Sequence, residues 1–338
     1  MKILYIYRHS QMGFSIGKVF KPIEEEMRKY AEVDSVYLPV PNYSLKGLWK
    51  NIMAARTAVR KKKYDIVHIT GAEHYLIPFL KGERIVVTVH DLGFCTILKH
   101  KISYRLKYYL FVSSLKKASM VTFISGKTEG ETLEYVKLKR GHYVTIPNPV
   151  GVEYQFHEKI FNSDCPVILH IGTKQHKNLD RSIEALKGIR CHFRIIGNVS
   201  AEQEKRMKEY GIQYSIGVNL SDKEVLQEYR NADIVNFPSL YEGFGMPIIE
   251  GQAVGRVVIT SNLNPMEDIA GGAAILVNPN DIESMHDAYL RAMNEDTRND
   301  IIEKGIKNVE RFLLTDIVYK YFSVYSEMFR SDNSPSFS

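Results

Sequence analysis

The sequence predicts an α/β protein with two doubly wound domains, each a parallel sheet with helices on both faces. Short apolar runs alternate with helical patterns through both halves, and the 338 residues are enough for two hydrophobic cores. An irregular, proline-bearing stretch separates the two series of elements. We therefore expect one domain over residues 1–150, a second over residues 165–314, and a linker at residues 147–166.

The first half opens with a buried-strand pattern at residues 3–7, followed by a glycine-bearing loop and a helix from Lys18 to about Tyr30. Gly13 and Gly17 in this loop lack the G-x-G-x-x-G spacing of dinucleotide-binding loops. The loop is therefore either a plain turn or a phosphate-binding loop, and we keep Gly13 as a candidate ligand contact. Further strands are expected at residues 35–38, 66–70, 85–90, 120–124 and 143–146.

His90 and Asp91 end the strand pattern Val86-Val-Thr-Val-His-Asp91. Ligands of doubly wound sheets bind beyond the carboxyl ends of the strands, so both residues are candidate site residues. A histidine at a strand end can also be an ordinary, hydrogen-bonded polar residue, and the pattern alone leaves both possibilities open.

The second half repeats the alternation of strands and helices. Ser221-Asp-Lys-Glu224 is a capping box that opens a helix, and helical patterns run from Ile282 to Arg330. We expect strands at residues 167–172, 192–197, 213–216, 234–237 and 257–260, and helices at 180–187 and 201–210.

The segment Ser239-Leu-Tyr-Glu-Gly-Phe-Gly-Met-Pro-Ile-Ile-Glu250 follows the apolar run at residues 234–237 and reads as a strand, a loop and a helix start. Pro247 suits the first helical position, which would place Glu250 in the first turn. Gly243 and Gly245 allow the backbone to approach a ligand closely, and helix-start N–H groups suit a diphosphate. Acidic residues near a helix start are also favoured by the helix dipole alone.

The pattern Glu242-Gly-Phe-Gly-x-Pro-x-x-Glu250 resembles the signature of retaining glycosyltransferases of family 4, which have the GT-B fold. Gly172-Thr-Lys-Gln-His-Lys-Asn178 is similar to the family loop that presents basic residues to the diphosphate. This loop departs from the family pattern, because His176 replaces an arginine and the loop is one residue shorter. The family commonly sends its last helix, here about residues 315–330, back onto the first domain.

The resemblance implies roles for individual residues. His90, Glu242 and Lys177 would be catalytic, with Lys177 at the diphosphate, Glu242 at the sugar hydroxyls and His90 contacting the sugar from the first domain across a cleft. Glu250 would hold the ribose. The expected donor-binding set is Gly13, Asp91, Gly172, Asn178, Gly243, Phe244, Gly245, Met246 and Glu250.

The implied function is transfer of a sugar from a nucleotide sugar to a glycan or lipid-linked acceptor in cell-surface polysaccharide synthesis. Two alternatives remain open: a sugar-nucleotide epimerase or phosphorylase of the same fold, and a binding module without turnover. We expect no cofactor and no metal, since no Asp-x-Asp motif occurs and the three cysteines form no C-x-x-C pair.

Charge divides unevenly between the halves. Residues 1–150 contain 25 Lys/Arg against 12 Asp/Glu, a net +13, and residues 151–338 contain 20 against 27, a net −7. No nucleic-acid-binding motif accompanies the basic half, and no run of 18 apolar residues occurs, so we expect a cytoplasmic protein that binds no nucleic acid. Two basic stretches, residues 46–63 and 99–117, are either helices that lie on an anionic membrane or ordinary surface helices.

Overall fold

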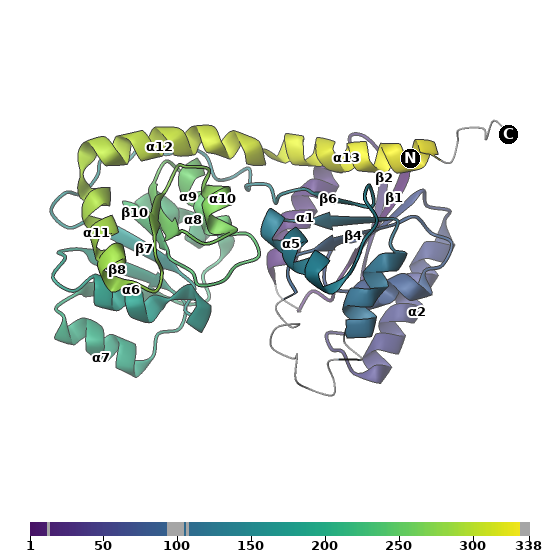
Figure 1. Ribbon diagram of the computed structural model, residues 1–338, viewed down its shortest axis with the longest axis horizontal. Helices are drawn as coiled ribbons and strands as arrows, with labels where there is room; N and C mark the ends of the chain where they lie inside the picture. The colour runs from purple at the N-terminus through teal and green to yellow at the C-terminus, as the bar shows by residue number, and fades with distance from the viewer. Residues whose placement is uncertain (12–13, 93–104, 106–107, 332–338) are drawn as a thin grey trace. The chain divides into compact units, whose positions relative to one another are not determined.

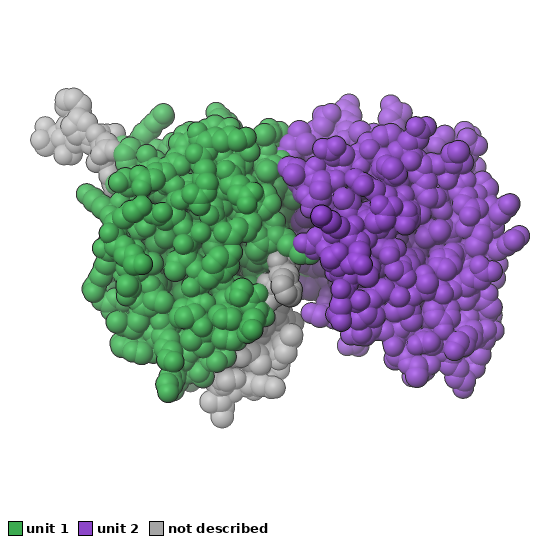
Figure 2. Space-filling model, turned by 180° about the vertical axis from the view of Figure 1, so that it is seen from behind, with its two compact units in different colours: residues 1–149, 314–338 green, residues 150–313 purple. Residues whose placement is uncertain are grey.

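The computed structural model describes residues 1–11, 14–92, 105 and 108–331. The chain divides into two compact units: unit 1 comprises residues 1–149 and 314–338, and unit 2 comprises residues 150–313. Figure 2 colours the two units separately. Unit 2 is a continuous segment, whereas the final helix of the chain belongs to unit 1.

Unit 1 is built on a six-stranded sheet in the order β2-β1-β3-β4-β5-β6, and every neighbouring pair is parallel. Its elements are β1 (Lys2–Tyr7), α1 (Phe14–Met27), β2 (Glu32–Tyr37), α2 (Leu45–Lys61), β3 (Ile66–Ile69), the 3₁₀ helix η1 (His74–Phe79), β4 (Ile85–Val89), the π-helix η2 (Tyr108–Val112), the 3₁₀ helix η3 (Ser113–Lys117), β5 (Met120–Phe123), α5 (Gly126–Tyr135), β6 (Tyr143–Thr145) and α13 (Leu314–Ser331).

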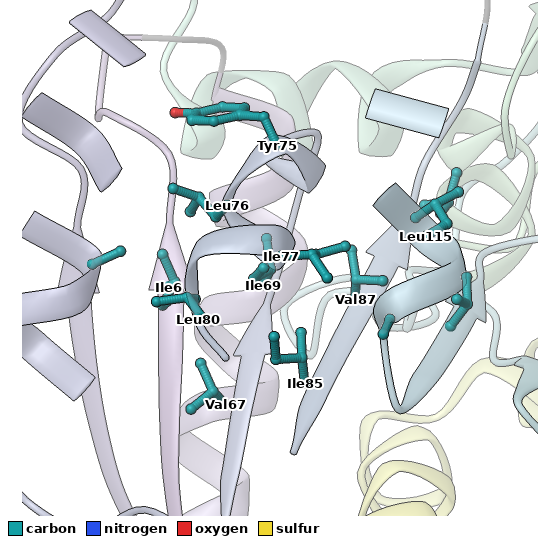
Figure 3. Packing of buried hydrophobic residues seen from close by; sticks show 14 of the residues in the cluster. Ile6, Val67, Ile69, Tyr75, Leu76, Ile77, Leu80, Ile85, Val87 and Leu115 are labelled. Carbon is teal, nitrogen blue, oxygen red and sulfur yellow. The ribbon is translucent and has the colours of Figure 1, made fainter. Parts of the chain in front are cut away.

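The two faces of this sheet bury different side chains, because successive residues of a strand point to opposite sides. Ile6 and Val87 pack with α2, η1 and η3 on one face, as Figure 3 shows for the residues around η1. Tyr5 packs with α1 and α13 on the other face. The predicted parallel sheet with helices on both faces is therefore confirmed for unit 1.

A buried polar cluster fixes α13 to the sheet. Tyr325 of α13 places its hydroxyl 2.6 Å from Nδ1 of His68 and 3.2 Å from the hydroxyl of Tyr5. The other ring nitrogen of His68 lies 2.9 Å from Oγ1 of Thr88, so both nitrogens of this buried histidine are satisfied. Without α13 this face of the sheet, including the buried apolar residues around His68, would be exposed to water, which is unfavourable.

Unit 2 is built on a second six-stranded sheet in the order β12-β11-β10-β7-β8-β9, again with parallel neighbours. Its elements are β7 (Val167–Ile171), the 3₁₀ helix η4 (Gln175–Lys177), α6 (Leu179–Ala185), β8 (His192–Ile196), α7 (Ala201–Glu209), β9 (Gln213–Gly217), α8 (Asp222–Asn231), β10 (Ile234–Phe237), α9 (Met246–Ala253), β11 (Val257–Ser261), α10 (Met266–Ala270), β12 (Ile275–Val277), α11 (Ile282–Met293), α12 (Glu295–Val309) and the 3₁₀ helix η5 (Glu310–Phe312).

Most predicted strands are confirmed within two residues, and the capping box at Ser221 and Glu224 has both of its hydrogen bonds. The first helix was placed wrongly: it spans Phe14–Met27, not Lys18 to about Tyr30. Gly17 lies inside this helix, where a glycine is tolerated at a moderate cost. The three-residue strand β12 was not predicted.

The first predicted basic stretch, residues 46–63, forms α2 and the residues that follow it. Much of the second, residues 99–104 and 106–107, lies outside the described residues, as do Gly13 and Cys95. Among the residues that the structure describes, the helices are too short or too polar to cross a membrane.

Candidate active site

The segment that carries the two acidic residues of the motif joins β10 to α9. Gly245 has a φ of 115°, a conformation that favours glycine, and it caps the start of α9 without any side-chain hydrogen bond. The helix therefore begins at Met246, and Pro247 is its second residue. This corrects the prediction for Glu250, which lies in the second turn of α9 and not in the first.

The loops after β7 and β10 meet at the point where the strand order of unit 2 reverses. The first strand of the unit, β7, pairs with β8 on one side and with β10 on the other, so chain connections diverge between β7 and β10. Ligands of doubly wound sheets bind at such a point, outside the carboxyl ends of the strands. Lys177 follows β7 and Glu242 follows β10, so topology alone brings these two predicted residues to one place.

Lys177 and Glu242 form an ion pair there, with 2.6 Å between Nζ and Oε1. Both side chains are largely buried, at 19% and 15% exposure, so water screens the pair less than it would at the surface. The Lys177 ammonium also lies 4.5 Å from the ring centroid of Phe237, the last residue of β10. These contacts hold a cation and a carboxylate side by side at the edge of the sheet.

Gly172 makes room for the Lys177 side chain. Its φ of 88° lies in the region that favours glycine, and a Cβ atom there would approach Cγ of Lys177 to 3.1 Å. The loop after β10 is tied to the same place, since the Leu240 amide donates to the His176 carbonyl over 2.7 Å. The two loops therefore form one structure around the ion pair.

Asn178 is buried and connects three loops. Its Nδ2 donates to the carbonyls of Pro238 and Pro279, over 3.1 Å and 2.6 Å, and its Oδ1 accepts from Arg181. Its backbone has a φ of 63°, which asparagine tolerates better than most residues. These bonds give Asn178 an evident role in positioning Lys177, and direct contact with a ligand stays a prediction.

Glu250 is positioned by a tyrosine that the sequence did not single out. The hydroxyl of Tyr229, on α8, donates to Oε2 of Glu250 over 2.5 Å. Burial, and after it the charge of Glu250, raise the pKa of Tyr229, so its proton stays on the phenol at neutral pH. The ring of Tyr154 packs edge-on against that of Tyr229, with 5.5 Å between centroids. No motif marks Tyr229 in the sequence, because it reads as an apolar residue of an amphipathic helix.

The other predicted donor-binding residues of this segment differ in exposure. Phe244 is 4% exposed and packs edge-on against Phe312 of η5, which makes it part of the core. Gly243 and Met246 are partly exposed, and Gly245 is buried at the start of α9. Of these residues, Gly243 and Met246 are therefore the most accessible to a bound nucleotide-sugar donor.

In unit 1, His90 follows β4 directly and is a neutral residue at pH 7. Burial lowers the pKa of His90 to about 4, against the opposing effects of the Thr70 carbonyl and of Asp91. Nε2 of His90 lies 2.9 Å from the Thr70 carbonyl, which only accepts, so Nε2 carries the proton. Nδ1 is then a hydrogen-bond acceptor. Asp91 is exposed at the same sheet edge.

Glu73 lies near this edge and was missed by the sequence analysis. It is 2% exposed, and its Oε2 has no hydrogen-bond partner among the described residues. Its Oε1 accepts a long hydrogen bond of 3.4 Å from Tyr43. Burial raises the pKa of Glu73 to about 7, although the charge of Arg8 acts in the opposite direction. No periodic pattern or motif distinguishes Glu73 from an ordinary surface carboxylate.

Among the residues that the structure describes, no three His, Cys, Asp or Glu side chains are grouped so as to hold a metal ion. Cys165 and Cys191 are free thiols, and Cys191 is buried. The described part of the candidate site therefore offers a lysine, carboxylates and backbone groups as its chemistry.

Solved structures similar to this chain define its fold. The sucrose-phosphate synthase of Thermosynechococcus elongatus superposes with a TM-score of 0.80 at 17% identity, over 98% of this chain and 100% of that one. The Anabaena protein Alr3699/HepE, in complex with UDP and glucose, superposes with a TM-score of 0.75 at 14% identity, over 97% of this chain and all of the other. The chain has the GT-B fold.

Family models then assign the chain more narrowly. Residues 18–154 match the model of glycosyltransferase family 4, and residues 153–308 match the model of glycosyl transferases group 1. The chain belongs to the family 4 glycosyltransferases.

Curated relatives are distant. The O-antigen chain mannosyltransferase B of Escherichia coli is 25% identical over 284 residues, which are 75% of this chain and 72% of the relative. An Escherichia coli UDP-Gal:alpha-D-GlcNAc-diphosphoundecaprenol alpha-1,3-galactosyltransferase is 25% identical over 324 residues, 85% of this chain and 81% of the relative. For the serotype-specific mannosyltransferase WbdA of the same species, the match spans only 29% of the relative's length.

Proposed function

We propose that this glycosyltransferase moves a hexose, with retention of anomeric configuration, from a nucleotide sugar to a glycan or lipid-linked acceptor in cell-surface polysaccharide synthesis. The observation that carries the proposal is the largely buried pair of Lys177 and Glu242 at the reversal of strand order in unit 2. The relatives named for mannosyl and galactosyl transfer, and the structural neighbour that holds UDP and glucose, support a nucleotide-sugar donor.

The reaction develops positive charge on the sugar and negative charge on the departing diphosphate. Lys177 would stabilise the diphosphate, together with backbone N–H groups at the start of α9. In the structure Lys177 is paired with Glu242, so a bound donor would share this cation with the carboxylate. Glu242, 2.6 Å from Lys177, would then accept hydrogen bonds from sugar hydroxyls next to the phosphates.

Glu250 would accept hydrogen bonds from the ribose hydroxyls, and the Tyr229 hydroxyl keeps its carboxylate oriented for this purpose. His90 is a neutral ring whose unprotonated Nδ1 can accept a hydrogen bond, and we propose it as a further sugar contact. Retention would follow from attack by the acceptor hydroxyl on the side of the leaving group, as the family implies. The acceptor proton would pass to the departing diphosphate.

Product analysis with a panel of nucleotide sugars tests the proposal. We expect slow release of nucleoside diphosphate and free sugar without acceptor, since water replaces the acceptor hydroxyl. We expect the release to persist with a chelator present, since Lys177 and backbone amides would meet the charge of the diphosphate. Conversion of the donor into an epimeric nucleotide sugar, or binding without any turnover, would contradict the proposal.

We also propose that the protein is cytoplasmic and touches the inner face of the membrane through its basic first half. The net charge of +13 over residues 1–150 supports attraction to anionic lipid. Cosedimentation with anionic and with neutral vesicles at low salt measures this attraction. Equal binding to both kinds of vesicle would exclude an electrostatic contact.

A further inference from the structure

The outer side of α2 exposes a stripe of large apolar residues. Leu45 is 80% exposed, Trp49 is 58% exposed and Met53 is 42% exposed. Residues four positions apart lie on one face of a helix, so the three side chains form a continuous row over about two turns. The adjoining side of α2 packs into the core of unit 1 through Ile52, Ala55 and Val59, among others.

The sequence alone leaves open whether residues 46–63 form an ordinary surface helix or one that lies on an anionic membrane, and the exposure of α2 bears on this choice. An ordinary surface helix needs one apolar stripe, and α2 satisfies that need with its buried side. The exposed row therefore widens the apolar side of α2 beyond the part that unit 1 buries, and the folding of unit 1 does not account for it. Figure 1 shows α2 on the outside of unit 1, on the sheet face opposite to α13.

The charged residues of α2 itself are all basic. No acidic residue occurs within α2, and its five basic residues are Lys46, Lys50, Arg56, Arg60 and Lys61. No ion pair joins these five to any carboxylate in the part of the chain that the structure describes. A row of Leu, Trp and Met among unpaired cations is the composition of a helix that lies in a membrane interface.

A neighbouring recess extends the surface. Arg56 and Arg60 of α2 line a recess of about 340 Å³ together with Phe79, the last residue of η1, and with Lys81 and Glu83, which follow it. Phe79 is 39% exposed, so a further large apolar side chain stands beside the same cations. The stripe of α2 with Phe79 is called the α2 face below.

We propose that the α2 face is the surface by which unit 1 lies on an anionic phospholipid bilayer, an inference that rests on the membrane contact proposed above. Trp49 would sit among the headgroups with Leu45 and Met53 reaching the acyl boundary. The lysines and arginines beside them would contact lipid phosphates with their charged groups, which flexible stems carry to the headgroups. An anionic bilayer matches both the apolar row and the basic residues of the face, because its apolar core lies directly beneath a negatively charged headgroup layer.

A second basic surface of unit 1 provides a matched comparison. Lys116, Lys117, Lys137 and Lys139 surround a recess of about 490 Å³, and no carboxylate lines it. The apolar residues in its wall are buried or partly buried, for example Leu115 at 1% exposure. This surface has comparable charge without an exposed apolar row, so it separates the effect of charge from that of the α2 face.

The experiment uses the full chain, in which Trp49 is the only tryptophan. Its fluorescence therefore reports the environment of the α2 face without interference from other tryptophans. Vesicles of phosphatidylglycerol, titrated at low salt, should shift its emission to shorter wavelength, and brominated lipid should quench it. Vesicles of phosphatidylcholine should produce little of either effect. About 0.5 M salt should weaken binding, because it screens exposed charges.

Three double variants test which surface of unit 1 binds the anionic vesicles. Lys46→Glu with Lys50→Glu should weaken vesicle binding at least about 30-fold, at about five-fold for each lysine removed. Leu45→Ser with Met53→Ser should weaken binding and reduce quenching. Lys137→Glu with Lys139→Glu changes the net charge of unit 1 equally and should weaken binding much less. All changed residues are exposed, and donor hydrolysis in solution should stay at the wild-type rate in all three.

The outcomes distinguish this inference from the proposal on which it rests. If wild-type protein binds no anionic vesicle, the membrane contact and the α2 face both fail. If it binds but Trp49 keeps its emission, or both lysine pairs matter equally, only the α2 face is refuted. Self-association without lipid that shifts Trp49 emission would also refute it, since a second copy would then cover the face.

Discussion

Replacing Glu73 by Gln should change how the stability of unit 1 depends on pH. Glu73 is buried, its Oε2 has no partner among the described residues, and its pKa rises from 4.5 to about 7 in the folded protein. Between pH 4.5 and about pH 7 the folded protein thus keeps a proton on Glu73 that the unfolded chain has released. This stabilising contribution is fully present below about pH 4.5 and is lost as pH rises through about 7.

The magnitude follows from the shift of the pKa. Each pKa unit corresponds to about 1.36 kcal/mol of folding stability, so the rise at Glu73 contributes about 3 kcal/mol in all. Most of this stability is lost between about pH 5 and pH 8. Glu73→Gln keeps a neutral polar group of the same shape and cannot ionise. The variant should therefore match wild type within about 1 kcal/mol near pH 5 and exceed its stability by roughly 2–3 kcal/mol near pH 8.

Urea unfolding followed by Trp49 fluorescence is the assay, because Trp49 lies on α2 and reports unit 1. The comparison is made near pH 5 and near pH 8. Glu25→Gln is the matched control, since Glu25 is exposed on α1 of the same unit. A difference between wild type and Glu73→Gln that stays constant over this range would refute the reasoning, and so would an equal effect of Glu25→Gln.

Further predictions concern the site in unit 2. Lys177→Ala should lower turnover by about 100-fold or more, and donor affinity less, because its charge faces a diphosphate that becomes more negative in the transition state. Glu250→Gln should weaken donor binding by roughly 1.5–3 kcal/mol, measured by calorimetry, through loss of a charge-assisted hydrogen bond. Tyr229→Phe should weaken it by a smaller amount, roughly 0.5–1.5 kcal/mol, since Glu250 loses one oriented donor. Gly172→Ala should lower melting temperature and turnover together, because the residue has a φ of 88° and its Cβ would crowd Lys177.

Controls make these comparisons specific. Lys205→Ala changes an exposed lysine on α7 of the same unit and should leave donor turnover unaltered. Circular dichroism of the Lys177, Glu250 and Tyr229 variants should match wild type. Full turnover of a folded Lys177→Ala protein would show that the diphosphate assignment is wrong. A donor affinity unchanged by Glu250→Gln would exclude the ribose contact, and a wild-type melting curve for Gly172→Ala would contradict the argument from its backbone.

Much of the fold follows from local sequence, because buried parallel strands are short apolar runs bounded by turn residues. The three-residue strand β12 was missed since so short a run carries no period. The start of α9 was misplaced by one residue. Gly245 caps this helix with its backbone alone, so no capping side chain marks the first helical residue in the sequence. Gly17 misled the placement of α1, since a glycine in sequence indicates a loop more often than a helix interior.

The candidate site was predictable where topology decides it. Lys177 and Glu242 are 65 residues apart, and the rule for strand reversal in doubly wound sheets brings their loops together. Tyr229 and Glu73 were not predictable. Their roles depend on which side chains fold over them, and neither helix periodicity nor spacing encodes a hydrogen bond from α8 to α9 or a carboxyl enclosed beyond β3.

The membership of α13 in unit 1 sets an order for biosynthesis. Residues 150–313 of unit 2 are continuous, so the core of this unit needs no residue that is synthesised after Leu313. The core of unit 1 does need later residues, since Tyr321 and Tyr325 of α13 fill it. The first half of unit 1 must therefore wait, with Tyr5 and His68 lacking their bonds to Tyr325, until α13 has been synthesised. A chain cut short before residue 314 would release a finished unit 2 attached to an unfinished unit 1, which is a natural substrate for chaperones and proteases.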